Sequence, residues 1–356
     1  DGTGQLRAQL TSGPWEVREV HGVDAPAGCV YVTGTLDTEL EHHLYRVPLA
    51  GGQPLRLTAP GFSHRALFDR ALTRYVDTFS NLTTPPRVQL HAPDGAVIRI
   101  ISDNPVPALA EFDFVPPRFL KVPTDTGFLM NVLELRPRAA TAPLPVVLET
   151  YAGPHAPCVH NRWLGRDWFA KQYLVQHGCL VWNIDPQSAS GCGAVSAWTC
   201  YRQLGVQELA DLEAGLRWLG AQGYADLARV ALCGYSYGGF MTSFALTHST
   251  AFQLGIAGAS PTDWRQYDSI YTERFMQTPA NNPDGYQRTS VVAAAANLSG
   301  RLLLVHGLLD DNVHVQNTLQ LVYALQQAGK PFDLMLYPGN RHGIRDNARH
   351  WLHTRL

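Results

Sequence analysis

The segment Gly234-Tyr-Ser236-Tyr-Gly238 places a serine between glycines, directly after an apolar stretch and directly before a helical one. A serine on a sharp strand-to-helix turn is exposed for attack on a carbonyl carbon, and glycines tolerate the close backbone contacts of such a turn. The amide that follows the serine, that of Tyr237, then points toward an oxyanion that forms during acyl transfer. The motif predicts that Ser236 is a nucleophile and Tyr237 an oxyanion donor.

A serine hydroxyl needs a histidine to remove its proton and a carboxylate to orient that histidine. Where a serine stands on this kind of turn, the acid and then the base follow it along the chain. Asp310 lies just beyond the apolar run 302–305, and His342 just beyond the apolar run 332–336. Ligands bind at the carboxyl ends of parallel strands, so these positions predict a triad of Ser236, Asp310 and His342.

Two further histidines near the acidic loop compete for the role of base. His306 lies inside the apolar end of the strand predicted at 302–305, and His314 begins the helix predicted over 314–328. Neither lies in a loop beyond a strand end, so His342 remains the predicted base.

The elements that must position these side chains alternate between strand and helix patterns. Strands are predicted at 145–150, 179–184, 229–233, 254–257, 302–305 and 332–336, and helices at 206–221, 238–248 and 314–328. In the first helix, Leu209, Leu212, Leu216 and Leu219 recur at helical spacing. The alternation predicts a mostly parallel sheet with helices on both faces, as in the α/β-hydrolase fold.

The first hundred residues have a different pattern, because they are β-like and repetitive. Tyr31-Val-Thr-Gly-Thr recurs as Tyr75-Val-Asp-Thr-Phe, and a Gly-containing turn follows each copy. Four short strands in about 40 to 50 residues are typical of a β-propeller blade. We therefore predict propeller blades over residues 1–103, a proline-stiffened linker over 104–120 and a catalytic domain over 121–356.

Residues 1–11 resemble the last hairpin of a third blade, which predicts that the chain begins inside a blade. Two blades and a fraction cannot close a ring and would leave an open edge strand. The expected explanation is a C-terminal part of a longer protein, and the alternative is a small open β-sheet domain.

Composition narrows the class of protein. The chain has 356 residues, 45% of them hydrophobic and 16% charged, with a formal net charge of −2. This balance fits a soluble globular protein and provides no basic surface for nucleic acid. No run of about 18 apolar residues is present, so we predict no transmembrane helix. The hypothesis for localisation is the bacterial cytoplasm or periplasm.

The six cysteines show no spacing typical of a metal site, and no metal or organic cofactor is expected. Most are interpreted as small buried apolar residues. A disulfide between Cys192 and Cys200 stays open at this stage.

Three segments together resemble the dipeptidyl peptidase IV family of the prolyl oligopeptidase group of serine peptidases. They are Gly234-Tyr-Ser-Tyr-Gly-Gly, Tyr267-Asp-Ser-Ile-Tyr-Thr-Glu-Arg274 and His306-Gly-Leu-Leu-Asp-Asp-Asn-Val-His314. The tyrosine-rich segment is the most specific of the three. The match covers roughly residues 120–356, and the two β-repeats fit the last blades of the family's eight-bladed propeller.

The resemblance implies further roles for residues of this sequence. Asp310 would be the triad acid, and the Tyr151 hydroxyl would bind the oxyanion beside the Tyr237 amide. The walls of the pocket for the residue before the cut would be Trp264, Tyr267, Tyr271, Tyr237 and Val313, and Asn312 would hold the preceding carbonyl. Dimers are common in the family, although no feature of this sequence requires one.

Two departures from the family pattern stand out. The family usually carries an arginine in the turn after the strand that ends here at Asp185, whereas this chain has Gln187 and serines. The family's glutamate pair, which holds the free amino terminus of the substrate, lies on the early propeller, outside this sequence.

The sequence therefore predicts a serine peptidase that releases X-Pro or X-Ala dipeptides from peptide N-termini through an acyl-enzyme. One rival is an acylaminoacyl peptidase or esterase with the same triad, and the segment 267–274 argues against it. The other is a catalytically silent binding module, against which the ordered Ser, Asp and His argue.

Overall fold

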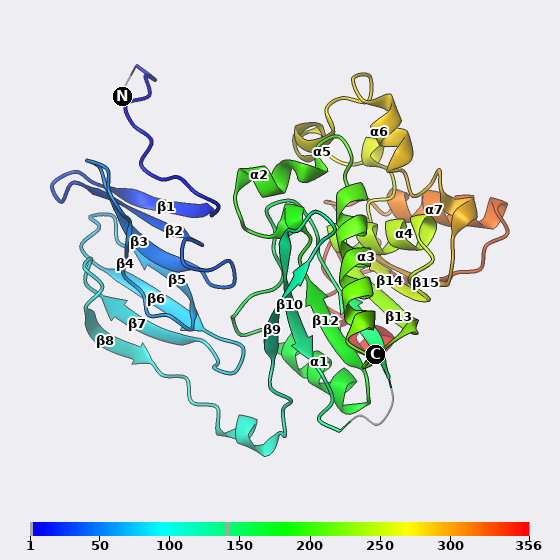
Figure 1. Ribbon diagram of the computed structural model, residues 1–356, viewed down its shortest axis with the longest axis horizontal. Helices are drawn as coiled ribbons and strands as arrows, with labels where there is room; N and C mark the ends of the chain where they lie inside the picture. The colour runs from blue at the N-terminus through cyan, green and yellow to red at the C-terminus, as the bar shows by residue number, and fades with distance from the viewer. Residues whose placement is uncertain (1–2, 140–142, 356) are drawn as a thin grey trace. The chain divides into compact units, whose positions relative to one another are not determined.

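The computed structural model describes residues 3–139 and 143–355 of the chain (Figure 1). Its strands are β1 (Val17–Asp24), β2 (Cys29–Gly34), β3 (His43–Pro48), β4 (Leu55–Arg56), β5 (Ser63–Phe68), β6 (Tyr75–Ser80), β7 (Arg87–His91), β8 (Val97–Ser102), β9 (Arg118–Pro123), β10 (Leu129–Leu135), β11 (Leu144–Glu149), β12 (Leu180–Ile184), β13 (Ala225–Tyr235), β14 (Leu254–Gly258), β15 (Arg301–Gly307) and β16 (Asp333–Tyr337). Its α-helices are α1 (Arg166–Gln176), α2 (Ala194–Ala197), α3 (Val206–Ala221), α4 (Tyr237–His248), α5 (Ser269–Met276), α6 (Pro283–Arg288), α7 (Gln316–Gln327) and α8 (Ala348–Arg355). Short 3₁₀ helices are η1 (Pro107–Glu111), η2 (Gln187–Ala189), η3 (Trp198–Cys200), η4 (Trp264–Gln266) and η5 (Ala295–Asn297).

The chain forms two compact units. One comprises residues 1–114, 160–168 and 191–195, and the other comprises residues 115–159, 169–190 and 196–356. The small segments that return to the first unit are attached by hydrogen bonds. Asn161 donates its side-chain amide to Glu41 at 2.7 Å, and the Trp163 backbone N–H donates to the Ser80 hydroxyl at 3.1 Å.

The first unit contains two four-stranded antiparallel sheets, in the orders β1-β2-β3-β4 and β5-β6-β7-β8. The predicted repeat of four strands is thus confirmed. Tyr31 and Tyr75, which occupy the same place in the two repeats, are both buried in one cluster with the ring of Phe68 between them, at centroid distances of 4.8 and 4.9 Å. The repeated tyrosine is therefore a packing residue of the unit. At the far edge, every residue of β8 is exposed.

The prediction of a hairpin in residues 1–11 is wrong for the residues that the structure describes. Residues 3–16 contain no strand, and Leu6 is 83% exposed. Residues 1–2 lie outside the described part of the chain. A hairpin is marginal in water unless its apolar face packs against another element, and the exposed Leu6 has no such packing.

The second unit is built on an eight-stranded sheet with the order β16-β15-β14-β13-β11-β12-β10-β9. Strands β11 to β16 pair in parallel with one another, and β10 and β9 add an antiparallel edge next to β12. Strand β12 is buried along its whole length, as expected for a strand covered on both faces. This arrangement confirms the predicted α/β-hydrolase sheet preceded by blade-like β-sheets.

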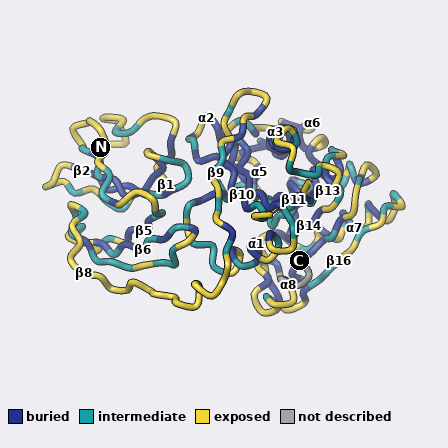
Figure 2. Tube along the Cα trace, turned by 60° about the horizontal axis from the view of Figure 1, so that its bottom comes forward, coloured by how far each residue is buried: buried dark blue, intermediate teal, exposed yellow. Residues whose placement is uncertain are grey.

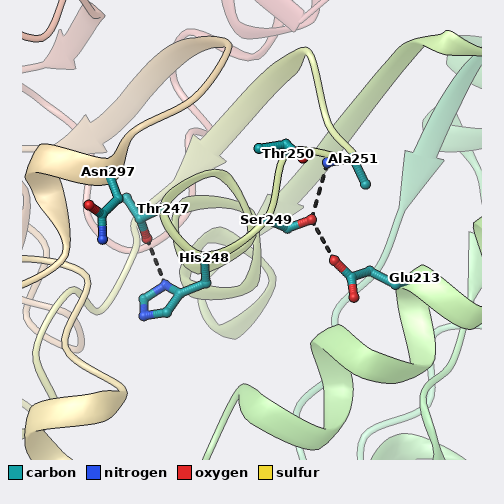
Figure 3. Close-up of a pocket in the computed structure, with 7 residues that line it drawn as sticks. All are labelled: Glu213, Thr247, His248, Ser249, Thr250, Ala251 and Asn297. Carbon is teal, nitrogen blue, oxygen red and sulfur yellow. Dashed lines mark hydrogen bonds between the residues drawn. The ribbon is translucent and has the colours of Figure 1, made fainter.

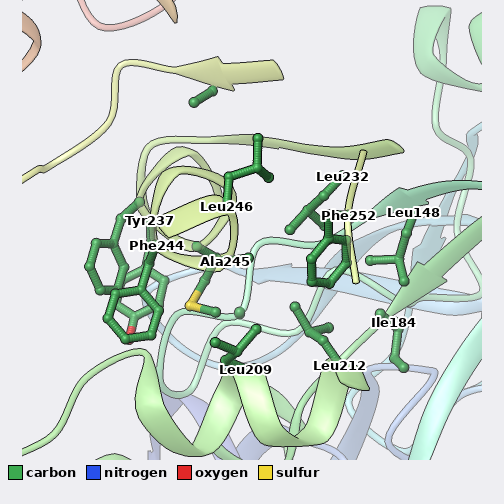
Figure 4. Packing of buried hydrophobic residues seen from close by; sticks show 14 of the residues in the cluster. Leu148, Ile184, Leu209, Leu212, Leu232, Tyr237, Phe244, Ala245, Leu246 and Phe252 are labelled. Atoms are coloured by element: carbon green, nitrogen blue, oxygen red, sulfur yellow. The ribbon is translucent and has the colours of Figure 1, made fainter. Parts of the chain in front are cut away.

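Two helices next to the sheet determine where the chemistry can occur. Helix α3 matches the predicted helix 206–221, and Leu212 and Leu219 on its inner face are fully buried. Helix α4 is buried on all sides, and every residue from Tyr237 to Thr247 is buried. Figure 2 shows the buried interior of this unit, and Figure 4 shows Leu209, Phe244 and Phe252 packing between the helices and the sheet. The nucleophile motif is therefore attached to the most buried helix of the unit.

Cys192 and Cys200 form no disulfide. The Cys192 thiol lies 3.7 Å from a carboxylate oxygen of Glu39, and the Cys200 thiol donates to the Ala197 carbonyl at 3.2 Å. No helix within residues 3–139 and 143–355 is long and apolar enough to cross a membrane.

Candidate active site

The turn between β13 and α4 holds Ser236 in a conformation that most residues avoid. Its φ is +60° and its ψ is −119°, and its backbone N–H donates to the Gly258 carbonyl at 2.8 Å. A side chain at Gly234 would come within 2.2 Å of the Gly238 carbonyl oxygen, and one at Gly238 within 2.4 Å of the Thr150 carbonyl oxygen. The glycines of the motif are thus required by direct backbone contacts, as the sequence predicts, and the strained turn projects the serine away from the sheet.

Three loops at the carboxyl ends of β13, β15 and β16 bring the predicted triad residues into one chain of hydrogen bonds. The Ser236 hydroxyl lies 3.0 Å from His342 Nε2, and His342 Nδ1 lies 2.8 Å from Asp310 Oδ2. Because a carboxylate only accepts hydrogen bonds, Nδ1 carries the proton and Nε2 faces the hydroxyl as an acceptor. The geometry is that of a nucleophile, a base and an orienting acid.

The Asp310 carboxylate is fully surrounded by hydrogen-bond donors. Its Oδ1 accepts the backbone N–H groups of Asn312 and Val313, each at 3.0 Å, and its Oδ2 accepts from His306 Nε2 at 3.2 Å as well as from His342. Burial alone would raise the pKa of Asp310, but the hydrogen bonds from the two histidines and the backbone hold this pKa well below its ordinary value. Asp310 is therefore an anion wherever the protein is folded near neutral pH.

The sequence reasoning missed the role of His306 as a partner of Asp310. Its Nδ1 lies 2.7 Å from the Thr318 hydroxyl, and its Nε2 also donates to the Val313 carbonyl at 2.8 Å. It is fully buried, which agrees with its interpretation as a poor candidate for the base. Its position at the end of an apolar strand, four residues before an aspartate, is the signal that could have indicated a second partner for Asp310.

The loop after β11 carries Tyr151, which burial and strain hold beside Ser236. Ala152 has a φ of +63°, and a side chain at Gly153 would come within 2.6 Å of the Tyr151 ring. Burial raises the pKa of the Tyr151 phenol, and a hydrogen bond with the Ser236 side chain opposes this rise. The phenol is therefore neutral and able to donate a hydrogen bond close to Ser236.

A buried carboxyl group anchors the far end of the same loop. Asp185 accepts the backbone N–H groups of Cys158 at 2.8 Å and Val159 at 2.9 Å. Burial raises the pKa of Asp185 to about 6. In the turn that departs from the family pattern, the Gln187 N–H donates to Asp211 at 2.8 Å. The altered turn is thus tied to helix α3.

The predicted pocket residues form one aromatic cluster around Tyr237. The Tyr237 ring lies 5.5 Å from that of Trp264 and 6.5 Å from that of Tyr271, and Tyr267 lies 5.6 Å from Tyr271. Asn312 enters this cluster by accepting the Tyr267 hydroxyl at 2.7 Å. Four aromatic rings can surround a small apolar group, and the amide of Asn312 adds one polar site at the edge.

Val313 follows Asn312, which bonds to the aromatic cluster, and lies in the loop that carries Asp310. It is fully buried, and its N–H and carbonyl are held by Asp310 and His306. The structure thus brings together every residue that the sequence analysis assigns to the site: Ser236, Asp310, His342, Tyr151, Tyr237, Trp264, Tyr267, Tyr271, Asn312 and Val313.

A separate pocket lies at the carboxyl end of α4 (Figure 3). Glu213 accepts the Ser249 hydroxyl there at 2.5 Å, and Thr247 and His248 are linked by a hydrogen bond of 3.0 Å. None of the triad residues lines it. In the described ranges 3–139 and 143–355, no group of three or more His, Cys, Asp or Glu side chains is arranged to hold a metal ion.

Comparisons with known proteins agree with this geometry. Residues 167–356 match the family model described as the prolyl oligopeptidase family, and residues 1–86 match that of the dipeptidyl peptidase IV N-terminal region. The chain is 36% identical to dipeptidyl peptidase 8 of Mus musculus and 34% identical to a probable dipeptidyl-aminopeptidase B of Emericella nidulans, over 94% and 98% of its length. It spans 40% of the length of each of these relatives.

A solved structure is also similar over the whole chain. The crystal structure of Porphyromonas gingivalis dipeptidyl peptidase 4 matches with a TM-score of 0.93 and 34% identity, covering 100% of this chain and 51% of that one. The family models, the relatives and the shared architecture agree. The chain belongs to the prolyl oligopeptidase family and, within it, to the dipeptidyl peptidase IV family.

Proposed function

We propose that the protein is a serine peptidase that releases dipeptides from peptide N-termini after proline or alanine. The observation that carries the proposal is the hydrogen-bonded chain from Ser236 through His342 to Asp310, with Ser236 on a strained turn and the Tyr151 hydroxyl beside it. The relatives named as dipeptidyl peptidases and dipeptidyl-aminopeptidases support the choice of substrate class.

Acylation begins when Ser236 Oγ attacks the scissile carbonyl carbon and its proton passes to His342 Nε2. Asp310 stabilises the imidazolium that forms, because it remains an anion beside Nδ1. The developing oxyanion receives hydrogen bonds from the Tyr151 hydroxyl and the Tyr237 backbone N–H. His342 then gives the proton to the leaving amine, and the dipeptidyl group stays on Ser236 as an ester.

Deacylation repeats these steps with water as the nucleophile. His342 removes a proton from the water as it attacks the ester carbonyl, and then returns a proton to Ser236 Oγ. A dipeptide with a free carboxylate leaves, and the enzyme is restored.

The aromatic cluster supports the preference for a small apolar residue before the cut. The rings of Tyr237, Trp264 and Tyr271 offer flat apolar walls and no charge, which suits a proline ring or an alanine methyl group. Asn312 lies at the edge of the cluster, where its side-chain amide can donate to the carbonyl of the preceding residue.

The test is the hydrolysis of Ala-Pro-p-nitroanilide beside its N-blocked counterpart by the full-length protein, with Ser236→Ala as the control. We expect cleavage of the free-amine substrate and a loss of at least about 10⁴-fold in kcat for the variant, because the nucleophile is gone. Preference for the blocked substrate would indicate an acylaminoacyl peptidase or an endopeptidase. Activity that survives Ser236→Ala would contradict the triad itself.

A further inference from the structure

Helix α3 carries a carboxyl group on its buried face, where the pattern of leucines would predict an apolar residue. Glu208 is fully buried, and it lies one helical turn before Leu212 on the same face of the helix. A buried carboxylate is costly unless its oxygens are hydrogen-bonded. The role of Glu208 is therefore defined by the groups that bond to it.

The two oxygens of Glu208 join the start of α3 to the residue that follows the nucleophile. Oε2 accepts the backbone N–H of Gly205 at 3.0 Å, and Oε1 accepts the Tyr237 hydroxyl at 2.8 Å. The first bond is the glutamate half of a capping box, in which the side chain at the third helical position accepts the N-cap backbone N–H; Gly205 has no side chain to provide the other half. That cap fixes the carboxyl group in place, so the second bond holds the tip of the Tyr237 side chain at a defined point.

Tyr237 connects the two parts of the proposed site. Its backbone N–H is at the first position of α4, directly after Ser236, and its ring is 3% exposed within the cluster formed with Trp264, Tyr271 and Tyr151. A rotation of this ring would move one wall of the pocket and displace the ring of Tyr151. Its hydroxyl is the one polar group of the side chain, and Glu208 is the acceptor of that hydroxyl.

We propose that Glu208 is a positioning residue that sets the orientation of Tyr237 and, through it, both the oxyanion amide and the pocket for the residue before the cut. This inference rests on the proposed function and adds a residue to it that touches neither the substrate nor the triad. Glu208 acts through Tyr237 alone, so changes at the two residues should have one shared effect.

The groups that face Glu208 explain why its ionisation matters. They are Asp211 on the same helix, Cys200 on η3, Tyr237 on α4 and Tyr271 on α5, and none of them carries a positive charge. Burial raises the pKa of Glu208 to about 7, against the opposing effect of its hydrogen bonds. In the anionic form both oxygens accept. In the protonated form one oxygen carries hydrogen, and the acceptor for Tyr237 or Gly205 is weakened.

The decisive experiment is a double-mutant cycle between Glu208→Gln and Tyr237→Phe in the full-length protein. The glutamine keeps the size of the side chain but has one accepting oxygen, and the phenylalanine keeps the ring but lacks the hydroxyl. We expect each change to lower kcat/KM for Ala-Pro-p-nitroanilide about tenfold, as the loss of a buried charge-assisted hydrogen bond implies, and the double variant to be no slower than either single one.

Two readouts separate positioning from a purely structural role. The oxyanion amide acts in the transition state, so kcat should fall more than KM rises. The pocket wall moves, so the ratio of kcat/KM for a substrate with proline before the cut to kcat/KM for one with alanine should fall. A structural role alone would lower the melting temperature and leave kcat and this preference unchanged in the folded fraction.

The matched control is Glu213→Gln, the same substitution on the same helix, at a carboxylate that also accepts a hydroxyl, that of Ser249. It lies in the separate pocket of Figure 3 and should leave kcat/KM unchanged. If Glu208→Gln fails to fold, Tyr237→Phe decides alone, since it removes the same hydrogen bond. Effects that multiply in the double variant, or a Glu208→Gln enzyme within twofold of the wild type, would overturn the proposal.

A second assay keeps the proposal separate from the choice of substrate. The rate at which diisopropyl fluorophosphate labels Ser236 depends on the nucleophile and the oxyanion donors, not on recognition of a dipeptide. We expect Glu208→Gln to slow labelling about tenfold even if the peptide specificity proposed above is wrong. Equal labelling rates would refute the positioning of the amide.

Discussion

Two regions of the second unit each bury a carboxyl group, and they shift its pKa in opposite directions. In the loop after β15, Asp310 receives two backbone N–H groups and the imidazole nitrogens of His306 and His342. Those donors hold its pKa far below the ordinary value in spite of burial. The acid of the proposed triad is thus kept charged by a complete set of partners.

In helix α3, Glu208 has a backbone N–H and a phenol as donors, and the nearby Asp211 carboxyl repels its charge. Burial, and to a lesser degree Asp211, raise its pKa to about 7. Both groups are buried, so burial alone does not decide their charge. The difference teaches that the number of donors and their charge determine whether a buried acid serves as a fixed anion or as a group poised between two protonation states.

The largest effect in this comparison is expected from the substitution Asp310→Asn. An amide in place of the carboxylate removes the negative charge and no longer imposes the tautomer with the proton on His342 Nδ1. We expect kcat to fall about 10⁴-fold, as for a triad whose acid is replaced by its amide. Initial rates with Ala-Pro-p-nitroanilide measure this loss, and a melting curve checks that the variant is folded. A loss of less than tenfold would show that the charge of Asp310 is not needed.

A smaller effect is expected when Asp310 loses one of its two histidine partners. His306→Phe preserves the volume of the ring but removes the Nε2–H donor that the Asp310 carboxylate and the Val313 carbonyl share. We expect the free energy of unfolding to fall by about 1–3 kcal/mol, the cost of leaving buried polar groups unpaired. Urea denaturation at pH 7 measures it. His314→Phe, at an exposed histidine of the same segment, is the control and should change little.

The smallest effect concerns the pH dependence of stability. The pKa of Glu208 is higher in the folded protein, about 7, than its ordinary value of 4.5, so the folded state binds the proton more tightly. Its contribution to stability is present below pH 4.5 and is lost as the pH rises through about 7. As the pH rises from 4.5 to 8, the unfolding free energy of the wild type should lose this contribution, while that of Glu208→Gln should not. The difference in unfolding free energy should therefore shift in favour of the variant as the pH rises. Urea titrations at pH 4.5, 6 and 8 test the trend.

Asp310 provides the opposite trend for comparison. Its pKa is lower in the folded protein, so its contribution to stability is present above the ordinary carboxyl pKa and is lost as the pH falls into the acid range. A difference between the wild type and Glu208→Gln that stays constant from pH 4.5 to 8 would contradict the distinction between the two regions.

Local patterns in the sequence predict much of this fold. The leucine spacing in 206–221 gives the bounds of α3, and the apolar runs 302–305 and 332–336 lie within two strands that carry the acid and the base at their ends. These elements are predictable because their burial is periodic or continuous along the chain. Residues 3–11, in contrast, alternate in the manner of a strand, but a strand also needs a pairing partner, which a local pattern does not reveal.

The parts of the site that sequence reasoning missed depend on contacts between distant segments. Glu208 and Tyr237 are 29 residues apart, and the carboxylate of Asp185 reaches back 26 residues to the N–H of Val159. Such pairs leave no periodic signal in a single sequence. The one available sign was a charged residue on an otherwise apolar helix face, as at Glu208, which indicates a buried partner without identifying it.

The all-round burial of α4 has a consequence for how activity is lost. Amide hydrogens of such a helix exchange with solvent only through large openings of the unit, so the segment that follows Ser236 belongs to its most protected part. His342 lies instead in a loop, with its side chain 28% exposed. We therefore expect the hydrogen-bonded chain from serine to aspartate to open first at its histidine. On warming, turnover should then fade before the unit unfolds, and cooling should restore it.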